Sequence, residues 1–440
     1  MAKMKWNKPL AIILPSVVLA SAMFGSVSTS TMAASKTSVA NTPTTLTFLG
    51  GAGLGQLYQQ LAAAFHKQYP KITVNVRLEA DNDYNTVLPR DLISNNSPDI
   101  FAPTTITQEV KDKLVANLDQ YANQYHWTSK IPSSILNWGR VNGKFVQGSG
   151  SLYEAGGYAG SVVGVFYNRA EAAKIGMKQA PRSLAQFEQD LANAKAKGLT
   201  PIVAAAQDGT INHLYNLLLG DYVGANAVNK IVFNDPTAKV NSPGALKAAQ
   251  TMQKWIKAGY FNADANAVGQ QASYGRFASG QGVFMFQGSW LVPVLDPMFK
   301  GKYGFFPMPP LKVGGNYTTM TGNALAFAIS AKSQHKAAAA LFLNWLTSPK
   351  AVQIAKQNGD YVAGKGVHAP APLKAPLNVQ FQDGYSLVAT GNGFDSWIVN
   401  ANPAMMPTMT AQLQLLFANK ATPSQFVNSL QSTYASAQGN

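Results

Sequence analysis

Hydrophobic residues in the first hundred positions follow the two periods of regular secondary structure. The run "TLTFLGG" at 45–51 predicts a buried strand that enters a glycine loop. Leu57, Leu61 and Phe65 then recur at helical spacing until Pro70. "KITVNVRL" at 71–78 alternates with a period of two and predicts a second strand, and "SPDIFAPTT" at 97–105 predicts a third, short one. Strands that alternate with helices indicate a largely parallel sheet with crossover helices.

The same alternation continues to the C-terminus. "GVFYNRAEAAKIGM" at 164–177 predicts a strand and a helix, "LTPIVAA" at 199–205 a strand, and "TGNALAFAISAKS" at 321–333 a strand that runs into a loop. Ser183 is the expected N-cap of a helix that runs to Gly198. Further helices are expected at 242–261, at 335–359 with a break at Pro349, and over most of 401–438. The pattern predicts one continuous α/β protein whose length suggests two lobes.

The stretch "GVFMFQGSWLVPVL" at 282–295 joins a buried strand to an unusual ending. Val283 to Phe286 form the apolar strand, and Gly288 and Ser289 end it. Trp290 follows directly, where a large aromatic ring lies at the mouth of the strand. From the residues alone, Trp290 could either fill the core, as most single aromatic residues do, or face a ligand.

The first 34 residues have the order of a secretory signal peptide. Three lysines precede an apolar run that is shorter than the roughly 20 residues needed to span a membrane, and small polar residues follow it. We expect cleavage after Ala33 or Ala34. The chain has no cysteine, so neither a disulfide nor a bacterial lipid anchor is expected. The sequence predicts a secreted, periplasmic or extracellular protein that carries no lipid.

The charge balance is basic, with 35 Lys and Arg against 20 Asp and Glu. The basic residues are scattered and form no stripe with aromatic residues, so we expect a solvated surface and no nucleic-acid partner. The five histidines are dispersed, with no metal-ligand spacing, so neither a metal nor a cofactor is expected. "GGAGLG" at 50–55 lacks the third glycine of a dinucleotide-binding loop, because Gln56 stands there. We therefore interpret it as a tight turn.

Acidic residues that could form a glycosidase pair are few. Asp83, Glu154, Asp208 and Asp395 lie in expected loops, so a pair of facing carboxylates stays open. Aromatic and amide side chains are more prominent in the expected loops and strand ends: Trp138, Tyr153, "AQDGTINHLY" at 206–215, Trp290, Tyr361 and "GFDSW" at 393–397. Flat apolar rings combined with neutral hydrogen-bonding groups are typical of sites for hydroxyl-rich ligands.

In order along nearly the whole chain after residue 45, several segments resemble the extracellular solute-binding proteins of sugar ABC importers, the group that includes maltose-binding protein. They are "LYQQLAAAFHKQYPKITVNV", "DLISNNSPDIFAP", "NGKFVQG", "GVFYNRAEAAKIGMKQAPRSLAQFEQDLANAKAKG", "FASGQGVFMFQGSW", "YGFFPMPP" and "AAAALFLNWLTSPKAVQIAKQNG". One departure is that most relatives have a proline after the "NGK-aromatic" piece, where this chain has "QGSG" at 147–150. We expect this stretch to be an inter-lobe crossing.

The resemblance implies an α/β, two-lobed periplasmic-binding-protein fold with a hinge and a ligand cleft between the lobes. It places lobe 1 at 41–152 and 320–355, and lobe 2 at 158–315 and 360–440. The ligand is expected at the carboxyl ends of the strands, and lobe closure is expected to bury it. The implied partners are a carbohydrate and the transmembrane subunits of an ABC permease, and the chain is expected to be a monomer.

The resemblance also suggests ligand contacts. Trp290 of "GSW" is the expected stacking residue, and Asp99 is expected to be structural. The further candidates, from the loops that supply polar or aromatic contacts in relatives, are Gly51, Thr104, Thr105, Asp208, Asn212, His213, Asn323, Tyr361 and Trp397. The function so implied is sugar capture without catalysis. The alternatives are a secreted polysaccharide-acting enzyme and a binder of a non-sugar solute.

Overall fold

The computed structural model describes residues 36–104, 106–131, 133–157, 159–299, 301–322, 325–362, 370–389, 393–395 and 397–438. The expected signal peptide at 1–34 lies outside the described residues, as do two candidate ligand contacts, Thr105 and Asn323. Among the described residues, no helix combines the length and the apolar character needed to cross a membrane.

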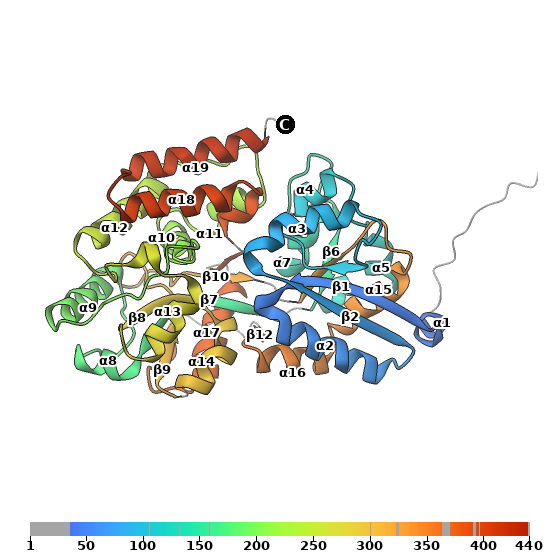
Figure 1. Cartoon of the computed structure of the whole chain (residues 1–440), viewed down its shortest axis with the longest axis horizontal. Coiled ribbons are helices and arrows are strands. Elements are labelled where there is room, and N and C mark those ends of the chain that lie inside the picture. The colour runs from blue at the N-terminus through green and yellow to red at the C-terminus, as the bar shows by residue number, and fades with distance from the viewer. Residues whose placement is uncertain are drawn as a thin grey trace, which may run out of the picture. The chain divides into compact units, whose positions relative to one another are not determined.

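The first lobe is built on a five-stranded sheet of order β2-β1-β3-β11-β6 (Figure 1). The strand β1 pairs in parallel with both β2 and β3, whereas β11 pairs antiparallel with β3 and β6. Parallel neighbours require crossover helices, which the sequence pattern predicted. The strands are β1 (Thr44–Gly51), β2 (Ile72–Glu79), β3 (Ile100–Phe101), β6 (Glu154–Gly156) and β11 (Ala326–Ile329).

Helices cover both faces of this sheet, with α3 on one face and α2 and α16 on the other (Figure 1). The apolar stripe of α2 buries Leu57, Leu61 and Phe65, as its spacing predicted. The helices of this lobe are α1 (Lys36–Asn41), α2 (Gly55–Gln68), α3 (Asp81–Ile93), α4 (Ile106–Lys111), α5 (Asp119–Tyr125), α6 (Trp127–Lys130), α7 (Ser133–Leu136), α15 (Lys336–Trp345) and α16 (Pro349–Gln357). Short 3₁₀ turns lie at η1 (Ala52–Leu54) and η2 (Asn137–Gly139), and β4 (Arg140–Val141) and β5 (Ser151–Leu152) form a separate hairpin.

The second lobe is organised around one long strand, β7 (Ala159–Asn168). It pairs antiparallel with four described strands, β8 (Phe284–Gly288), β9 (Tyr303–Phe306), β10 (Thr319–Gly322) and β12 (Tyr361–Val362). A further strand, β13 (Gly393–Asp395), pairs in parallel with β10 and extends the sheet. Every residue of β8 is buried, as its continuous apolar run predicted.

Some helices of the second lobe begin at side-chain caps. The Ser183 side chain accepts a hydrogen bond from the backbone N–H of Gln186, which confirms it as an N-cap, and Ser242 does the same for Ala245. The helices are α8 (Arg169–Lys174), α9 (Leu184–Ala196), α10 (Asn212–Val223), α11 (Ala225–Val232), α12 (Pro243–Lys257), α13 (Gln270–Ala278), α14 (Val292–Phe299), α17 (Leu377–Ala389), α18 (Met405–Phe417) and α19 (Pro423–Gln438). The 3₁₀ turns are η3 (Ala265–Ala267), η4 (Ser289–Leu291) and η5 (Ile398–Ala401).

The structure corrects three expectations. "LTPIVAA" is not a regular strand: only Ile202 pairs, through single bridges to Phe261 and Phe284. The second segment of lobe 1 was expected to begin at residue 320, but β10 pairs with β7 in the other sheet, so this boundary moves to the segment between β10 and β11. The stretch 147–150 is not a crossing, because β4 and β5 pair with each other on either side of it and β5 is followed by β6 of the first sheet.

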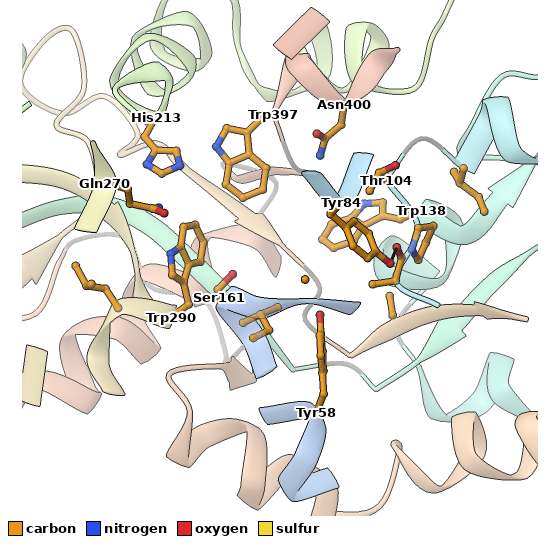
Figure 2. Close-up of a pocket in the computed structure, with 18 of the residues that line it drawn as sticks. Tyr58, Tyr84, Thr104, Trp138, Ser161, His213, Gln270, Trp290, Trp397 and Asn400 are labelled. Carbon is orange, nitrogen blue, oxygen red and sulfur yellow. Dashed lines mark hydrogen bonds between the residues drawn. The ribbon is translucent and has the colours of Figure 1, made fainter. Parts of the chain in front are cut away.

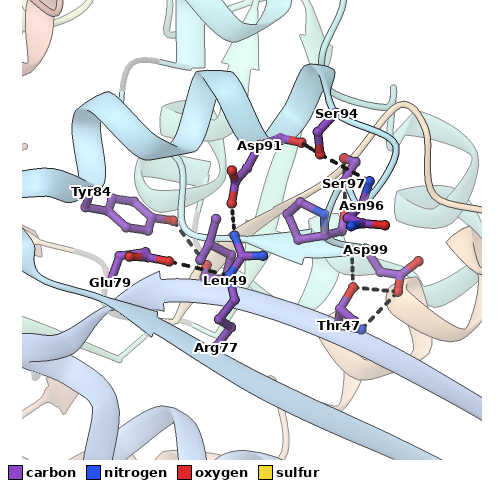
Figure 3. Close-up of polar contacts among 11 residues, drawn as sticks. Thr47, Leu49, Arg77, Glu79, Tyr84, Asp91, Ser94, Asn96, Ser97 and Asp99 are labelled. Atoms are coloured by element: carbon purple, nitrogen blue, oxygen red, sulfur yellow. Dashed lines mark hydrogen bonds and ion pairs between the residues drawn. The ribbon is translucent and has the colours of Figure 1, made fainter.

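Asp99 ties strands of the first lobe together, as expected (Figure 3). Its Oδ2 accepts hydrogen bonds from the backbone N–H of Thr47 at 2.9 Å and from the Thr47 hydroxyl at 3.1 Å. Its Oδ1 accepts one from the Ser333 hydroxyl at 2.6 Å. A buried carboxylate is stable only when it is satisfied in this way, so Asp99 is confirmed as a structural residue.

Candidate functional site

A cavity of about 510 Å³ lies between the two sheets, at the ends of β1, β3 and β8 (Figure 2). Pockets that enclose small organic ligands have volumes of roughly 300–1,000 Å³. Lobe 1 contributes Gly51, Gly53, Leu54, Tyr58, Tyr84, Ala102, Pro103, Thr104, Ile106, Trp138, Gln147, Glu154 and Ala326. Lobe 2 contributes Ser161, His213, Val232, Gln270, Gln271, Tyr274, Trp290, Leu291, Val294, Trp397 and Asn400.

Trp290 is held at the cavity by the turn that ends β8. The backbone of Gly288 lies directly against the indole ring, since a Cβ built on Gly288 would approach the ring to 2.1 Å. The Ser289 hydroxyl accepts a hydrogen bond from the backbone N–H of Val162 in β7 at 3.0 Å. Gly359, at a φ of +89°, packs against the carbonyl of Ser289 from the segment that leads into β12. The small residues after the strand therefore position the tryptophan.

Three rings from separate segments meet at this wall of the cavity (Figure 2). The Trp290 and Trp397 centroids lie 5.8 Å apart, and the His213 ring lies 5.8 Å from Trp290 and 5.7 Å from Trp397. Both tryptophans are only partly buried, although they pack on the main core of lobe 2. Residues that only filled the core would be fully enclosed, so the two indoles keep exposed surface at the cavity.

The His213 ring is buried, and burial lowers its pKa to about 4. Its Nδ1 lies 3.4 Å from the Phe286 carbonyl oxygen, a long contact. His213 is therefore neutral at pH 7. The indole Nε1 of Trp397 is buried and has no hydrogen-bond acceptor among the residues that the structure describes.

Asp208 and Asn212, which the sequence suggested as ligand contacts, do not line the cavity. The Asp208 Oδ2 accepts a hydrogen bond from the backbone N–H of Gln270 at 2.6 Å, and its Oδ1 accepts one from Thr210 at 3.1 Å. It thereby holds the start of α13, whose Gln270 does reach the cavity. Asn212 is buried, and its side-chain amide donates to the Gly209 carbonyl at 2.8 Å.

Of the other described candidates, some line the cavity and one is buried away from it. Gly51 and Thr104 line the cavity from lobe 1. Tyr361 does not; it is buried and stacks on Phe381 of α17, with the ring centroids 5.4 Å apart. The structure thus brings together five of the predicted residues: Gly51, Thr104, His213, Trp290 and Trp397.

Tyr58 and Tyr84 of lobe 1 were not predicted as ligand contacts, whereas Trp138 was among the aromatic residues that the sequence singled out. Tyr58, Tyr84 and Trp138 line the cavity opposite the lobe 2 aromatics (Figure 2). The Tyr84 hydroxyl donates to the backbone carbonyl of Leu49 at 3.1 Å or of Ala102 at 2.8 Å (Figure 3). This anchor fixes the ring at the carboxyl ends of β1 and β3. Tyr84 shares helical spacing with apolar residues of α3, so its position in the sequence has the pattern of a core residue.

Glu154 is the carboxylic acid among the described lining residues. Desolvation, together with the nearby Glu109 carboxylate, raises its pKa to about 8. Glu109 is buried behind the cavity, where its Oε1 accepts a hydrogen bond from the backbone N–H of Thr104 at 3.2 Å. The described lining residues include no lysine or arginine, so at pH 7 the cavity wall is largely neutral.

No group of three or more His, Cys, Asp or Glu residues in the described part of the chain could hold a metal ion. The arrangement is a concave surface of aromatic rings, amides and hydroxyls between the two lobes. Such a surface can bind a neutral ligand through ring faces and hydrogen bonds.

Several known proteins with similar sequences or folds are named as binding proteins. The multiple sugar-binding protein of Streptococcus mutans serotype c is 28% identical over 332 residues, which cover 72% of this chain and 75% of the relative. Two solved structures share the two-lobed fold. A chitin oligosaccharide binding protein aligns with a TM-score of 0.72 at 20% identity over 90% of this chain and 99% of its own. An ABC substrate-binding protein from Listeria monocytogenes in complex with cycloalternan aligns with a TM-score of 0.66 at 19% identity, over 90% and 99%.

The profile of the family described as bacterial extracellular solute-binding protein matches residues 51–353. This match covers more than half of the chain, from the end of β1 to α16. The two-lobed fold and the cavity between the sheets agree with it. The chain therefore belongs to the family of bacterial extracellular solute-binding proteins.

Proposed function

We propose that this protein captures an oligosaccharide in the cavity between its lobes and delivers it to the transmembrane subunits of an ABC importer. The observation that carries the proposal is the cluster of Trp290, Trp397 and His213. The partly exposed faces of the two indoles lie opposite the lobe 1 rings and close to amide and hydroxyl groups. A sugar ring has apolar C–H faces and an edge of hydroxyls, so it needs this combination of surfaces.

The neutral lining supports a neutral sugar. Gln270, Gln271, Asn400 and Thr104 offer uncharged donors and acceptors. The Streptococcus mutans relative is named as a sugar-binding protein, which supports the same ligand class. The cavity volume, with aromatic rings on both walls, favours a ligand of more than one sugar ring.

Catalysis is not part of this proposal. A glycosidase needs two carboxyl groups that flank the scissile bond. Here Glu154 faces the cavity, whereas Glu109 is buried behind it and accepts the Thr104 N–H. The relatives that the chain resembles are named as binding proteins. A turnover assay on oligosaccharides separates the two functions, because a binding protein leaves its ligand intact.

A charged solute fits this cavity less well. A phosphorylated ligand would need arginine or lysine, and the described lining residues contain neither. A polyamine would need several carboxylates, and the described lining holds Glu154 alone.

The proposal includes export and release as a monomer that carries no lipid. Residues 1–34 have the charge and hydropathy order of a signal peptide, and the sequence has no cysteine to carry a lipid. The scattered basic residues support the absence of a nucleic-acid partner. Mass spectrometry of the secreted protein would identify the mature N-terminus, and a start other than residue 34 or 35 would require a different cleavage site.

The sugar assignment can be tested by a thermal-shift screen against mono- and oligosaccharides. A ligand present at about 100 times its Kd should stabilise the protein by about 2.7 kcal/mol. Polyamines and sugar phosphates form the comparison set. The proposal fails if no sugar raises the melting temperature, or if a charged solute raises it more than any sugar does.

A further inference from the structure

The hairpin of β4 and β5 reaches from lobe 1 to lobe 2. Its loop spans residues 142–150. The backbone N–H of Gln147 donates a hydrogen bond to the carbonyl oxygen of Phe233 at 3.0 Å. Phe233 follows α11 in lobe 2. The loop does not carry the chain between lobes, yet it makes a direct contact between them.

The loop backbone is shaped for this contact. Within the hairpin, Asn142 N–H donates to the Val146 carbonyl and Gly148 N–H donates to the Arg140 carbonyl. These bonds lie on either side of Gln147 and leave its N–H to face Phe233. Gly148 has a φ of +96°, and a Cβ built there would lie 3.3 Å from the Phe233 ring. A side chain at residue 148 would therefore be strained and would crowd the ring.

Phe233 belongs to the packing of both lobes. It is partly buried, and its side chain packs against the main hydrophobic cluster of lobe 2 and also against that of lobe 1. Separating the lobes would expose apolar surface on Phe233 and break the hydrogen bond from Gln147.

The same contact borders the ligand cavity. Gln147 and Val232, which precedes Phe233, both line it. The Gln147 side-chain amide also donates to the carbonyl oxygen of Trp138, whose ring is part of the lobe 1 wall. The contact is therefore made at the place where the two walls meet.

We propose that Gln147 and Phe233 form a clasp that holds the two lobes closed over the cavity, and that Phe233 thereby sets the closed population of the protein. Phe233 is a positioning residue here, because it acts through the arrangement of the lobes. A ligand that binds between the lobes adds to the stability that the clasp already gives the closed form. The clasp does not depend on which solute the cavity takes.

Closure can be measured without any ligand. Because the natural chain has no cysteine, Lys67→Cys in α2 and Lys257→Cys in α12 place one fluorophore on each lobe at exposed positions. Single-molecule energy transfer then reports the closed and open populations. Phe233→Ala should lower the ratio of closed to open molecules about fivefold. Phe145→Ala removes the exposed phenylalanine of the same hairpin and serves as the matched control, with no change expected.

A second pair of variants isolates the backbone hydrogen bond to Phe233. Gln147→Pro removes the N–H that faces Phe233 and also the side-chain amide that donates to Trp138, whereas Gln147→Ala removes the side-chain amide alone. Gln147→Pro should therefore shift molecules further toward the open state than Gln147→Ala does. Thermal unfolding of each variant checks that the lobes remain folded. The clasp is refuted if the folded Gln147→Pro protein has the same populations as the natural chain, or if Phe145→Ala opens the protein as much as Phe233→Ala does. Neither result would touch the sugar assignment, which the thermal-shift screen decides.

Discussion

The indole planes of Trp290 and Trp397 are inclined at 56° to each other, with their centroids 5.8 Å apart. One ring follows β8 and the other precedes η5, so two distant segments of lobe 2 build a single aromatic corner. The buried His213 ring supports both. Because the planes are tilted, the two indoles present faces in different directions. This geometry suits a ligand that bends between two sugar rings better than one flat ring.

Trp290→Ala should weaken binding of the sugar found in the screen by about 2 kcal/mol, or roughly 30-fold in Kd, as for other aromatic anchors of binding sites. Its effect on the free energy of unfolding should be smaller, because the ring is only partly buried. Isothermal titration calorimetry and urea denaturation measure the two quantities. The matched control is Trp255→Phe, since Trp255 is fully buried in the same lobe; it should lower stability and leave affinity unchanged. If Trp290→Ala lowered the free energy of unfolding strongly and left the affinity unchanged, Trp290 would be a core residue.

Gly288→Ala should weaken sugar binding although no ligand-facing side chain is changed. The new methyl group would occupy the space of the Trp290 indole, so the ring must move. We expect about a tenfold loss in affinity from the displaced ring and a stability cost of about 1–3 kcal/mol from overpacking. Gly275→Ala in α13 is the control, because no described heavy atom beyond its chain neighbours and its own helix backbone lies within 4 Å of the position that its new methyl group would take. Unchanged affinity in folded Gly288→Ala would mean that the indole position does not matter for binding.

The place of Trp290 at the edge of the sheet was predictable from the sequence because local order determines it, whereas His213 and Trp397 were suggested by the resemblance to sugar-binding proteins. A continuous apolar strand that ends in glycine and serine must put the next residue at the edge of the sheet, and Trp290 is that residue. The helix caps at Ser183 and Ser242 are local in the same sense. In these cases the order of residues along the chain is enough to predict where the strand ends and where the helices begin.

The lobe 1 wall depended on contacts that spacing does not encode. Tyr84 lies on the apolar stripe of α3 and becomes a cavity residue only because its hydroxyl is anchored between β1 and β3. Glu154 belongs to a three-residue strand that has no periodicity to recognise. In lobe 2, Tyr361 of β12 is buried in the core because its ring stacks on that of Phe381, which belongs to a separate element, α17. Each of these outcomes is decided by tertiary packing.

Asp208 should act on binding through α13. Its carboxylate accepts the Gln270 N–H at the start of that helix, where a negative charge is also favourable to the helix dipole. Asp208→Ala should cost about 1 kcal/mol of stability and weaken sugar binding severalfold by loosening Gln270. Asp208→Asn keeps an acceptor oxygen, so it should retain most of the stability and most of the affinity for the sugar. If the asparagine variant lost as much affinity as Trp290→Ala, Asp208 would be a direct ligand contact, as its place in the sequence suggested.

The raised pKa of Glu154 predicts a stability that falls as pH rises. Burial and Glu109 raise this pKa from its ordinary value of 4.5 to about 8. Between these two values the folded protein holds a proton on Glu154 that the unfolded chain has released, so the free energy of unfolding decreases with increasing pH across this window. The contribution is fully present below about pH 4.5 and is lost as pH passes 8.

Glu154→Gln carries no titrating group and should remove this contribution, so its free energy of unfolding should decline less between pH 5 and pH 8 than that of the natural protein. Urea denaturation at several pH values gives both curves. Asp221 and Asp360 also have pKa values raised by burial, and they remain in both proteins, so only the difference between the curves reports on Glu154. Parallel curves would show that Glu154 is ionised in the folded cavity at neutral pH. The lobe 1 wall would then carry a negative charge, and a ligand with a positively charged amino group would become the better candidate for this cavity.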